Sequence, residues 1–514
     1  MKMKKITKLL AFIIIASVLL ISFSACNNGS GSNNPAENTT RNGDSAGNSA
    51  ENNQTETDAN LRENTPDSLP DNLNFNGTEV RVFHRANESE TDGYVEEIAV
   101  ESEIGEIVND ALYMRNQKVE DRLNIKIVSV SQPGGWTNRD NFLSTIRKSV
   151  GAGTSDFDYI AGYAYYITSL APEGLLYNLR DVEYLNPEAV WWSASLADQL
   201  TIDNKLYYIT GDYAITFLKT MFVMYYNKTL AQDIGLPNLY QIVLDGGFTV
   251  DKMSELMKGA YQDINGNSKP DEADRYGFAL TTGNFVDAMF NTFDLPIVRK
   301  DTDGVPQLAL NSQRMVGAVE KIYSLLYESG NTFAIDEKVS GSGDLVKNMF
   351  IENRTLFLPG TMGTSDGFRA MNSDYGIIPY PKLDDSQPNY YTTSQDSYSL
   401  FCVPVTCDKT DVVGATMEAM CAESYRTVTP AYYEIALKKK YTRDDESSQM
   451  LDLIRSGATF DFGTVNSINM DNINKIFRDL MTEKKTDFVS RYDKSESKWQ
   501  KDLDKLVAAY NNLP

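Results

Sequence analysis

Oxygen-bearing side chains recur at set intervals in the acidic stretch DINGNSKPDEAD. In a calcium loop of the EF-hand type, positions one, three, five, nine and twelve supply side-chain oxygens, and position seven supplies a backbone carbonyl. The residues at those positions here are Asp263, Asn265, Asn267, Asp271 and Asp274, with the carbonyl of Lys269. The stretch therefore predicts a calcium site made of hard oxygen ligands.

Two features of this stretch depart from the standard loop. Glycine stands at position four, as Gly266, rather than at position six, and the last ligand is Asp274 rather than a bidentate Glu. A strand pattern follows the loop where an EF-hand has its second helix, so we expect a structural site rather than a switch. Its Kd should be about 10⁻⁴–10⁻³ M, as in extracellular modules. The alternative is an Asn-Gly turn that binds no metal.

Catalytic patterns are weak in the rest of the sequence. GTSDG, from Gly363 to Gly367, matches the G-x-S-x-G nucleophile elbow, which needs a histidine base after the serine. The chain's only histidine, His84, lies upstream, and a single histidine also disfavours zinc sites and histidine relays. Paired carboxylates of a glycosidase remain an alternative, but no pair stands out. We therefore expect a binding protein rather than an enzyme.

The N-terminus has the features of an exported lipoprotein. A basic segment, MKMKKITK, precedes the apolar run LLAFIIIASVLLISF, and small residues lead to Cys26. So short a run with a small-residue exit is typical of a cleaved signal peptide, here residues 1–25. FSAC resembles the bacterial lipobox, with Phe23 in place of the usual Leu. Acylation of Cys26 would hold the protein on the outer membrane leaflet; the alternative is an ordinary signal with an incidental cysteine.

Residues 26–75 are expected to form the lipidated cysteine and a disordered tether, because they contain too few apolar side chains to offset chain entropy. Loss of the signal's four lysines would take the net charge from −23 to −27. So acidic an exported domain should repel phosphate backbones, and nucleic acid is not an expected partner. Cys402, Cys407 and Cys421 lack metal spacing and are expected to be buried free thiols.

Alternating strand and helix patterns predict an α/β fold in the rest of the chain. Short apolar runs at 78–83, 124–130 and 156–162 are typical of strands, and amphipathic helical patterns separate them. Strands in this order indicate βαβ units and a mostly parallel sheet, whose ligands bind beyond the carboxyl ends of the strands. The later part of the chain repeats this alternation and ends on a helix with an apolar stripe.

Several sequence blocks follow one another over nearly all of residues 76 to 440, and they include IRKSVGAGTSDFDYIAG, APEGLLYNL, DNKLYYITGDY, MYYNKTLAQDIGLP, FIENRTLFLPG and SYSLFCVPV. Their order resembles the family 1 extracellular solute-binding proteins of ABC importers, the sugar-binding class. One departure is Phe248-Thr249, where the family usually has a Trp at a helix start. The stretch TPAYYEIALKKKYTRDDESSQMLDLI resembles long members from Gram-positive bacteria.

The resemblance implies a two-lobed clamshell of the type II periplasmic-binding-protein kind. Lobe one is expected to comprise residues 76–212 and 355–399, and lobe two residues 217–354 and 400–514. It also implies a lipid-anchored receptor on the extracellular face of the cell membrane, which passes a carbohydrate to an ABC permease and requires no cofactor. A surface glycoside hydrolase and a sugar-sensing receptor lobe remain alternatives.

Candidate ligand-binding residues follow the predicted strand ends and the lobe crossings. Tyr163 and Tyr165 follow the third strand and Trp136 follows the second, and aromatic planes stack on the apolar faces of sugar rings. The alternative for each tyrosine is packing against the next helix. Further candidates, placed by the crossings and strand ends of the implied fold, are Asp212, Tyr213, Thr282, Asn284, Gly360, Thr361, Asp396 and Tyr398.

Overall fold

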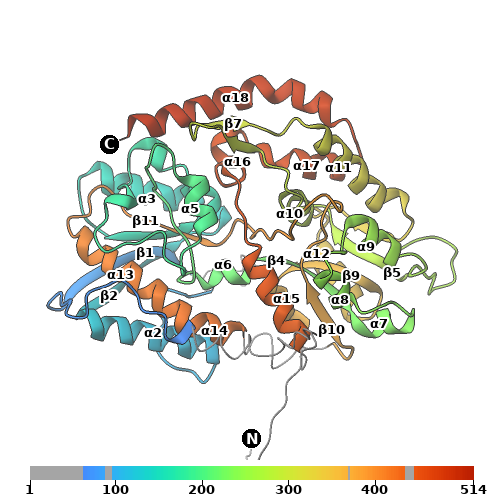
Figure 1. Ribbon diagram of the computed structural model, residues 1–514, viewed down its shortest axis with the longest axis horizontal. Coiled ribbons are helices and arrows are strands. Elements are labelled where there is room, and N and C mark those ends of the chain that lie inside the picture. Colours follow the sequence, from blue (N-terminus) through green and yellow to red (C-terminus); the bar gives the residue numbers. More distant parts are fainter. Residues whose placement is uncertain (1–61, 87–94, 369–370, 434–444, 514) are drawn as a thin grey trace, which may run out of the picture. The chain divides into compact units, whose positions relative to one another are not determined.

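The computed structural model describes residues 62–86, 95–368, 371–433 and 445–513, which belong to one compact unit, Thr55–Pro514 (Figure 1). The expected signal peptide, Cys26 and the tether up to residue 61 lie outside the described residues. None of the helices in the described ranges is long and apolar enough to cross a membrane.

The first sheet has the strand order β11-β3-β1-β2. Its strands are β1 (Thr78–Ala86), β2 (Ile125–Pro133), β3 (Tyr159–Tyr163) and β11 (Ser399–Cys402). Strand β1 pairs in parallel with both β2 and β3, and β11 is antiparallel to β3. The helices of this lobe include α2 (Ile107–Leu123), α3 (Arg139–Gly151) and α13 (Thr410–Glu423). Helix α2 buries Leu112, Val119 and Leu123 at helical spacing and packs against α13.

The second sheet has the order β10-β4-β9-β5-β8. Its strands are β4 (Phe222–Asn227), β5 (Tyr276–Thr281), β8 (Thr332–Ile335), β9 (Thr355–Thr361) and β10 (Tyr375–Ile378). A separate antiparallel hairpin consists of β6 (Val298–Lys300) and β7 (Pro306–Leu308). The strands β4 and β5 are fully buried, which explains why they read as continuous rather than alternating apolar runs.

The remaining helices connect and cover the two sheets. Before strand β5 in the chain they are α4 (Ala164–Ile167), α5 (Ala194–Leu200), α6 (Ile215–Lys219), α7 (Lys228–Asp233), α8 (Leu239–Leu244) and α9 (Val250–Leu256). After β5 they are α10 (Asn284–Thr292), α11 (Gln313–Tyr323), α12 (Ser342–Ile351), α14 (Thr429–Ala431), α15 (Asp445–Ser456), α16 (Phe462–Val465), α17 (Ile476–Thr482) and α18 (Phe488–Asn512). The short 3-10 segments η3 (Ala171–Glu173), η6 (Met362–Phe368) and η9 (Ser467–Met470) lie between them.

Membership of the two sheets defines two lobes, whose boundaries differ from the expected ones at the C-terminal side. Strands β9 and β10, expected in lobe one, belong to the second sheet, and β11, expected in lobe two, belongs to the first. Residues 355–378 and 399–423 therefore exchange lobes relative to the expectation. Sheet membership is decided by pairing between distant segments, such as β9 with β4 and β11 with β3, and a strand pattern does not encode its partner.

Three chain segments run side by side where the chain passes between the lobes. Phe222 donates its backbone N–H to the carbonyl of Thr393, and Thr459 donates its N–H to the carbonyl of Thr392. On the lobe-one side, the buried carboxylate of Glu97 accepts hydrogen bonds from the N–H of Thr216, at 2.8 Å, and from the hydroxyl of Ser399. These bonds join the outgoing and returning crossings into one hinge.

The C-terminal helix α18 contacts both lobes. It is 25 residues long and is the uppermost ribbon in Figure 1. It packs against α11, α17 and β7 on the side of the second sheet, and against η3 on the side of the first. Near its end, the ring of Tyr510 lies 5.6 Å from that of Tyr207, which belongs to lobe one. The expected apolar stripe runs through Trp499, Leu503, Leu506, Val507 and Tyr510; all but the partly buried Val507 are buried, which confirms the amphipathic pattern.

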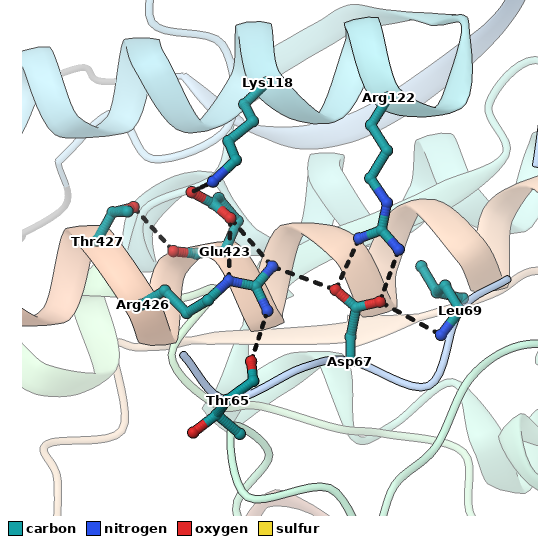
Figure 2. A network of polar contacts seen from close by, with 8 residues as sticks. All are labelled: Thr65, Asp67, Leu69, Lys118, Arg122, Glu423, Arg426 and Thr427. Atoms are coloured by element: carbon teal, nitrogen blue, oxygen red, sulfur yellow. Dashed lines mark hydrogen bonds and ion pairs between the residues drawn. The ribbon is translucent and has the colours of Figure 1, made fainter. Parts of the chain in front are cut away.

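An ion-pair network holds the start of the described chain on lobe one (Figure 2). The carboxylate of Asp67 accepts hydrogen bonds from Arg122 of α2, at 2.7 and 2.8 Å, and from Arg426, at 3.2 Å. Arg426 also binds Glu423, which accepts a hydrogen bond from Lys118 at 2.7 Å. Because Asp67 and Glu423 are almost fully buried and each has cationic partners, the N-terminal segment is fixed to α2 and to the end of α13.

Candidate interlobe binding site

A cavity of about 690 Å³ lies between the lobes. Lobe one contributes α4 and the end of α5, and lobe two contributes the end of α10 and the β6–β7 hairpin. The hinge segment 391–398 and the segment 459–465 complete the wall. A volume of this size is within the range of pockets that enclose small organic ligands.

Tyr165, Asp396 and Tyr398 are the predicted site residues that line this cavity. The backbone N–H of Tyr165 donates to the carbonyl of Asp396 at 3.2 Å, so the hinge segment and α4 lie against each other. The Tyr165 hydroxyl donates to the side chain of Asn472. This contact and burial fix the ring in place, and burial raises the pKa of its hydroxyl to about 12.

Trp136 extends the aromatic surface beside the cavity. Its ring lies 5.4 Å from that of Tyr165 in an edge-on arrangement, and 43% of the residue is exposed. The guanidinium of Arg139 lies 4.2 Å from the Trp136 ring centroid and covers part of it. The structure thus brings Trp136 and Tyr165 together, although β1 lies between the strands β2 and β3 that they follow, and Trp136 itself is outside the cavity wall.

Tyr163 supports the site from behind. Its ring stacks on Tyr166 at 5.3 Å and contacts the guanidinium of Arg85 at 5.1 Å. Its hydroxyl donates to Asp396 at 3.2 Å. Burial raises the pKa of Asp396, and this hydrogen bond and the nearby Arg478 oppose the rise. Tyr163 therefore holds a cavity carboxylate in position and does not itself line the cavity.

Two nearly buried residues of the cavity wall carry hydroxyls that have no hydrogen-bond partner among the described residues. Tyr398 is 3% exposed and Thr393 is 7% exposed, and both line the cavity. The Tyr398 ring packs edge-on against the Phe460 ring, with 5.9 Å between the ring centroids. Buried polar groups in proteins are nearly always hydrogen-bonded. These hydroxyls are therefore available to a ligand.

Asp461 fixes the segment that carries Phe460. Its carboxylate accepts hydrogen bonds from the N–H groups of Ile297, Val298 and Thr464, at 3.1, 3.2 and 2.8 Å. Burial raises the pKa of Asp461 to about 6, and these hydrogen bonds oppose the rise. The segment 459–465 is thereby joined to the start of the β6–β7 hairpin. We did not predict any residue of this segment, because it carries no motif and follows the last recognisable block.

The carboxyl end of β5 is covered by α17. Thr282 is 3% exposed, and its carbonyl accepts a hydrogen bond from the hydroxyl of Thr482 at 2.8 Å. Asn284 accepts a hydrogen bond from Arg478 at 2.5 Å. Arg478 also pairs with Asp287, whose pKa burial raises to about 7. Thr282 and Asn284 therefore face α17 and do not line the cavity.

The remaining candidates lie at the hinge or in the second sheet, outside the cavity wall. Asp212 accepts hydrogen bonds from Thr429, at 2.6 Å, and from Arg455. Tyr213 is fully buried and stacks on Phe401 at 4.4 Å. Gly360 and Thr361 belong to β9, where they pair with Val223 and Phe222 of β4. A crossing position in the sequence thus identifies the hinge but not the face that meets a ligand.

The acidic loop has its carboxylates directed inward. Asp263 accepts hydrogen bonds from the N–H groups of Gly266 and Ser268, at 2.7 and 2.8 Å. Asp271 accepts from the amides of Asn265 and Asn267. Asp274 is fully buried and accepts from the N–H of Ile264 at 3.1 Å and the hydroxyl of Tyr261 at 3.0 Å.

Carboxylate and amide oxygens are the ligands calcium prefers, so the donor set of this loop fits that ion. Within the described residues, no group of three or more His, Cys, Asp or Glu side chains has the arrangement of a metal site. In this arrangement Asp263, Asp271 and Asp274 bind N–H groups and a hydroxyl of their own segment, and the calcium site stays a prediction.

The G-x-S-x-G match has no catalytic geometry. The hydroxyl of Ser365 donates to the carbonyl of Met362 at 2.9 Å inside η6, and Ser365 is 3% exposed. His84 lies in the first sheet, where its ring nitrogen is 2.7 Å from the hydroxyl of Ser129. Serine and histidine therefore belong to different lobes. Cys402, Cys407 and Cys421 are free and buried, as predicted.

The chain belongs to the bacterial extracellular solute-binding proteins, because the sequence pattern of that family matches residues 137–424. No curated protein matches the chain. Its fold is similar to that of the cyclic α-maltosyl-1,6-maltose binding protein from Arthrobacter globiformis, with 15% identity, a TM-score of 0.51, and coverage of 85% of this chain and 98% of that one.

It is also similar to UgpB from Mycobacterium tuberculosis in complex with glycerophosphocholine, with 15% identity, a TM-score of 0.51, and coverage of 77% of this chain and 95% of that one. A cyclo/maltodextrin-binding protein complexed with maltotetraose gives 14% identity, a TM-score of 0.51 and coverage of 85% and 97%. At these identities the likeness concerns the fold, and it confirms the two-lobed type II clamshell.

Proposed function

We propose that this protein is a receptor that closes its two lobes on a carbohydrate and delivers it to an ABC permease. The observation that carries the proposal is the interlobe cavity, in which aromatic rings and free hydroxyls occur together. Tyr165, Tyr398 and Phe460 supply the rings, and Tyr398 and Thr393 supply hydroxyls without partners among the described residues.

This combination suits a sugar. The C–H faces of a pyranose ring pack on aromatic planes, while its hydroxyls need hydrogen-bond donors and acceptors within the same small volume. Among the structures of similar fold, two are described as binding maltose-type sugars and one holds glycerophosphocholine, which is also rich in oxygen. These ligands agree with a polyhydroxylated solute for this chain as well.

The proposed work of the protein is binding without bond cleavage. Members of its family are binding proteins. A ligand shifts a two-state protein toward its closed form only by the difference between its affinities for the two forms. Residues that reach the ligand from both lobes supply that difference. Tyr165 from lobe one and Asn291 from lobe two both line the cavity.

The proposal places the protein on the outer face of a cell membrane. A lipid on Cys26 would hold it there, and the acidic loop from Asp263 to Asp274 would bind a structural calcium ion. The family is extracellular, which agrees with an exported chain. The permease partner and the origin in a Gram-positive bacterium follow from the sequence resemblance described above.

Isothermal titration calorimetry with a panel of mono- and oligosaccharides tests the proposed function. At least one sugar should bind, and the Tyr398→Phe variant should bind it more weakly, because the lost hydroxyl faces the cavity. The Tyr177→Phe variant is a matched control, since Tyr177 is a partly buried lobe-one tyrosine outside the cavity wall. Absence of binding to every sugar would exclude the proposed role, and turnover of one of them would indicate an enzyme instead.

A further inference from the structure

We propose that the interlobe cavity selects a positively charged carbohydrate, one that carries amino groups. This inference rests on the proposed function and names the chemical class of its ligand. It follows from the charges that face the cavity, the aromatic rings between them, and the hydroxyl of the nearly buried Tyr398.

Carboxylates outnumber cations in the cavity wall. The acidic residues of the wall are Asp198, Asp294, Asp301, Asp396 and Asp461. The basic residues of the wall are Arg299 and Lys300. Both basic residues are on the β6–β7 hairpin, at one side of the cavity, whereas the carboxylates come from α5, the end of α10, the hairpin, the hinge segment and the segment before α16.

These two cations neutralise little of the negative charge in the cavity wall. The ammonium of Lys300 donates to the backbone carbonyl of Asp198, where it closes the wall between the hairpin and α5, and burial lowers its pKa. Arg299 is exposed on the hairpin, as are the wall carboxylates Asp198 and Asp294, so the buried part of the wall owes its negative charge chiefly to Asp396. The carboxylate of Asp301 is hydrogen-bonded within its own turn, because it accepts from the N–H groups of Asp303 and Val305.

The charges just behind Asp396 also balance each other. Arg478 and Lys475 are close enough to stabilise the ionised carboxylate of Asp396. Arg478, however, is paired with both Asp287 and Glu337. That group of side chains therefore brings no surplus of positive charge to the cavity.

Closure of the lobes on a ligand would remove these carboxylates from water. Taking a charge out of water without a counter-ion is costly, and a neutral sugar would bring hydroxyl donors but no charge. An ammonium group on the ligand supplies both the charge and the donors. An anionic sugar would add repulsion to the same cost.

The cavity also has the other two elements of an ammonium site. Aromatic faces attract cations, and the rings of Tyr165, Tyr398 and Phe460 line the same wall as Asp396. Tyr398 is only 3% exposed, and its hydroxyl can accept a hydrogen bond from the ligand's N–H. This free hydroxyl points to a ligand independently of the carboxylates.

Calorimetry with matched sugar pairs tests the inference. Chitotriose, which carries free amines, is compared with its N-acetylated form, and glucosamine is compared with glucose, at a pH at which the amines are protonated. The aminated member of at least one pair should bind about tenfold more tightly or better, as expected for hydrogen bonds to a charged group. The Asp396→Asn and Asp294→Asn variants should each reduce that preference, whereas Asp303→Asn, on the same hairpin but outside the wall, should keep it.

The possible outcomes separate this inference from the proposed function. If a neutral sugar of the panel binds and no aminated sugar binds more tightly than its neutral counterpart, the inference is overturned and the carbohydrate role stands. If no sugar binds at all, both fail. If the preference exists but survives both Asp396→Asn and Asp294→Asn, the amine is recognised elsewhere and the assignment to this cavity is overturned.

Discussion

Arg455 and Asp212 form an ion pair across the hinge: Nη2 of Arg455 lies 2.9 Å from both carboxylate oxygens of Asp212. Arg455 belongs to α15, which packs against α8 and β10 of lobe two, whereas Asp212 ends the lobe-one segment before α6. The Asp212 side chain is 4% exposed and the Arg455 side chain 21%. The pair therefore ties the first crossing to a helix of the other lobe.

Removing one partner of this pair should be costly. Arg455→Met would leave the buried Asp212 carboxylate with Thr429 as its side-chain hydrogen-bond partner among the described residues, and should lower the free energy of unfolding by about 3–5 kcal/mol. Arg491→Met is the matched control, because the Arg491 partners Glu483 and Asp487 are partly exposed, and it should cost at most about 1 kcal/mol. Urea unfolding measures both, and equal losses would mean that the hinge pair is of no special importance.

Tyr165→Ala should weaken sugar binding by about 1–3 kcal/mol, because it removes an aromatic ring from the cavity wall. Tyr163→Phe should have a smaller effect, since it removes only the hydrogen bond that positions Asp396. Calorimetry gives both affinities, and melting curves check that the fold is intact. Unchanged affinity in Tyr165→Ala would move the ligand toward Trp136.

Glu418 should make stability fall as the pH rises. Its side chain is fully buried and accepts a hydrogen bond from Trp192 at 2.9 Å, and burial raises its pKa from 4.5 to about 7. Between these two values the folded state binds the proton more tightly than the unfolded state, so its stabilising contribution is lost as the pH rises through about 7.

The expected loss from Glu418 is about 3 kcal/mol in total. Glu418→Gln cannot ionise, so it should flatten the fall in stability between pH 4.5 and 7. Glu101→Gln, at an exposed position, is the control. Chemical unfolding at a series of pH values measures the slope. A variant as pH-dependent as the wild type would show that Glu418 is not the group that titrates.

Calcium should raise the melting temperature by a few degrees at most. Millimolar calcium over a sub-millimolar site stabilises the folded state by about 1–2 kcal/mol. Asp263→Ala combined with Asp271→Ala should abolish the difference between melts with calcium and with chelator. Asp274 is a poorer choice, because it is fully buried and its loss would disturb the loop without any metal. If chelator changes nothing in the wild type, the segment is only a turn.

Cys26→Ser should release the protein from membranes, because Cys26 is the cysteine at the predicted cleavage site. Labelling with a radioactive fatty acid and fractionation of cells measure lipid attachment and location. The buried Cys407→Ser variant serves as the control and should remain lipidated. Labelled lipid on the Cys26→Ser protein would contradict the lipobox interpretation.

The sequence predicts the class of fold well, because strand and helix patterns are local. The first three strands of lobe one and the amphipathic α18 follow from local side-chain patterns alone. Lobe membership after β8 does not, because β9, β10 and β11 are all short buried strands of similar composition. Only their long-range pairing separates them.

The candidate site is predicted in part for the same reason. Tyr165 and Asp396 could be found because they flank strands whose ends meet at the hinge. Phe460 and Asp461 could not, since their place in the wall depends on how the chain returns after α15. Asp212 shows the converse case: it stands at a crossing, as expected, but its carboxylate turns toward Arg455 rather than toward the cavity.

The attachment of Asp67 to Arg122 and Arg426 has a mechanical consequence (Figure 2). Both arginines belong to the lobe of the first sheet, so a lipid on Cys26 would anchor the protein through lobe one. Lobe two, with the second sheet and the hairpin that closes the cavity, would be the lobe that moves relative to this anchor. A permease bound to the anchored receptor would then sense ligand capture chiefly as a movement of lobe two relative to lobe one.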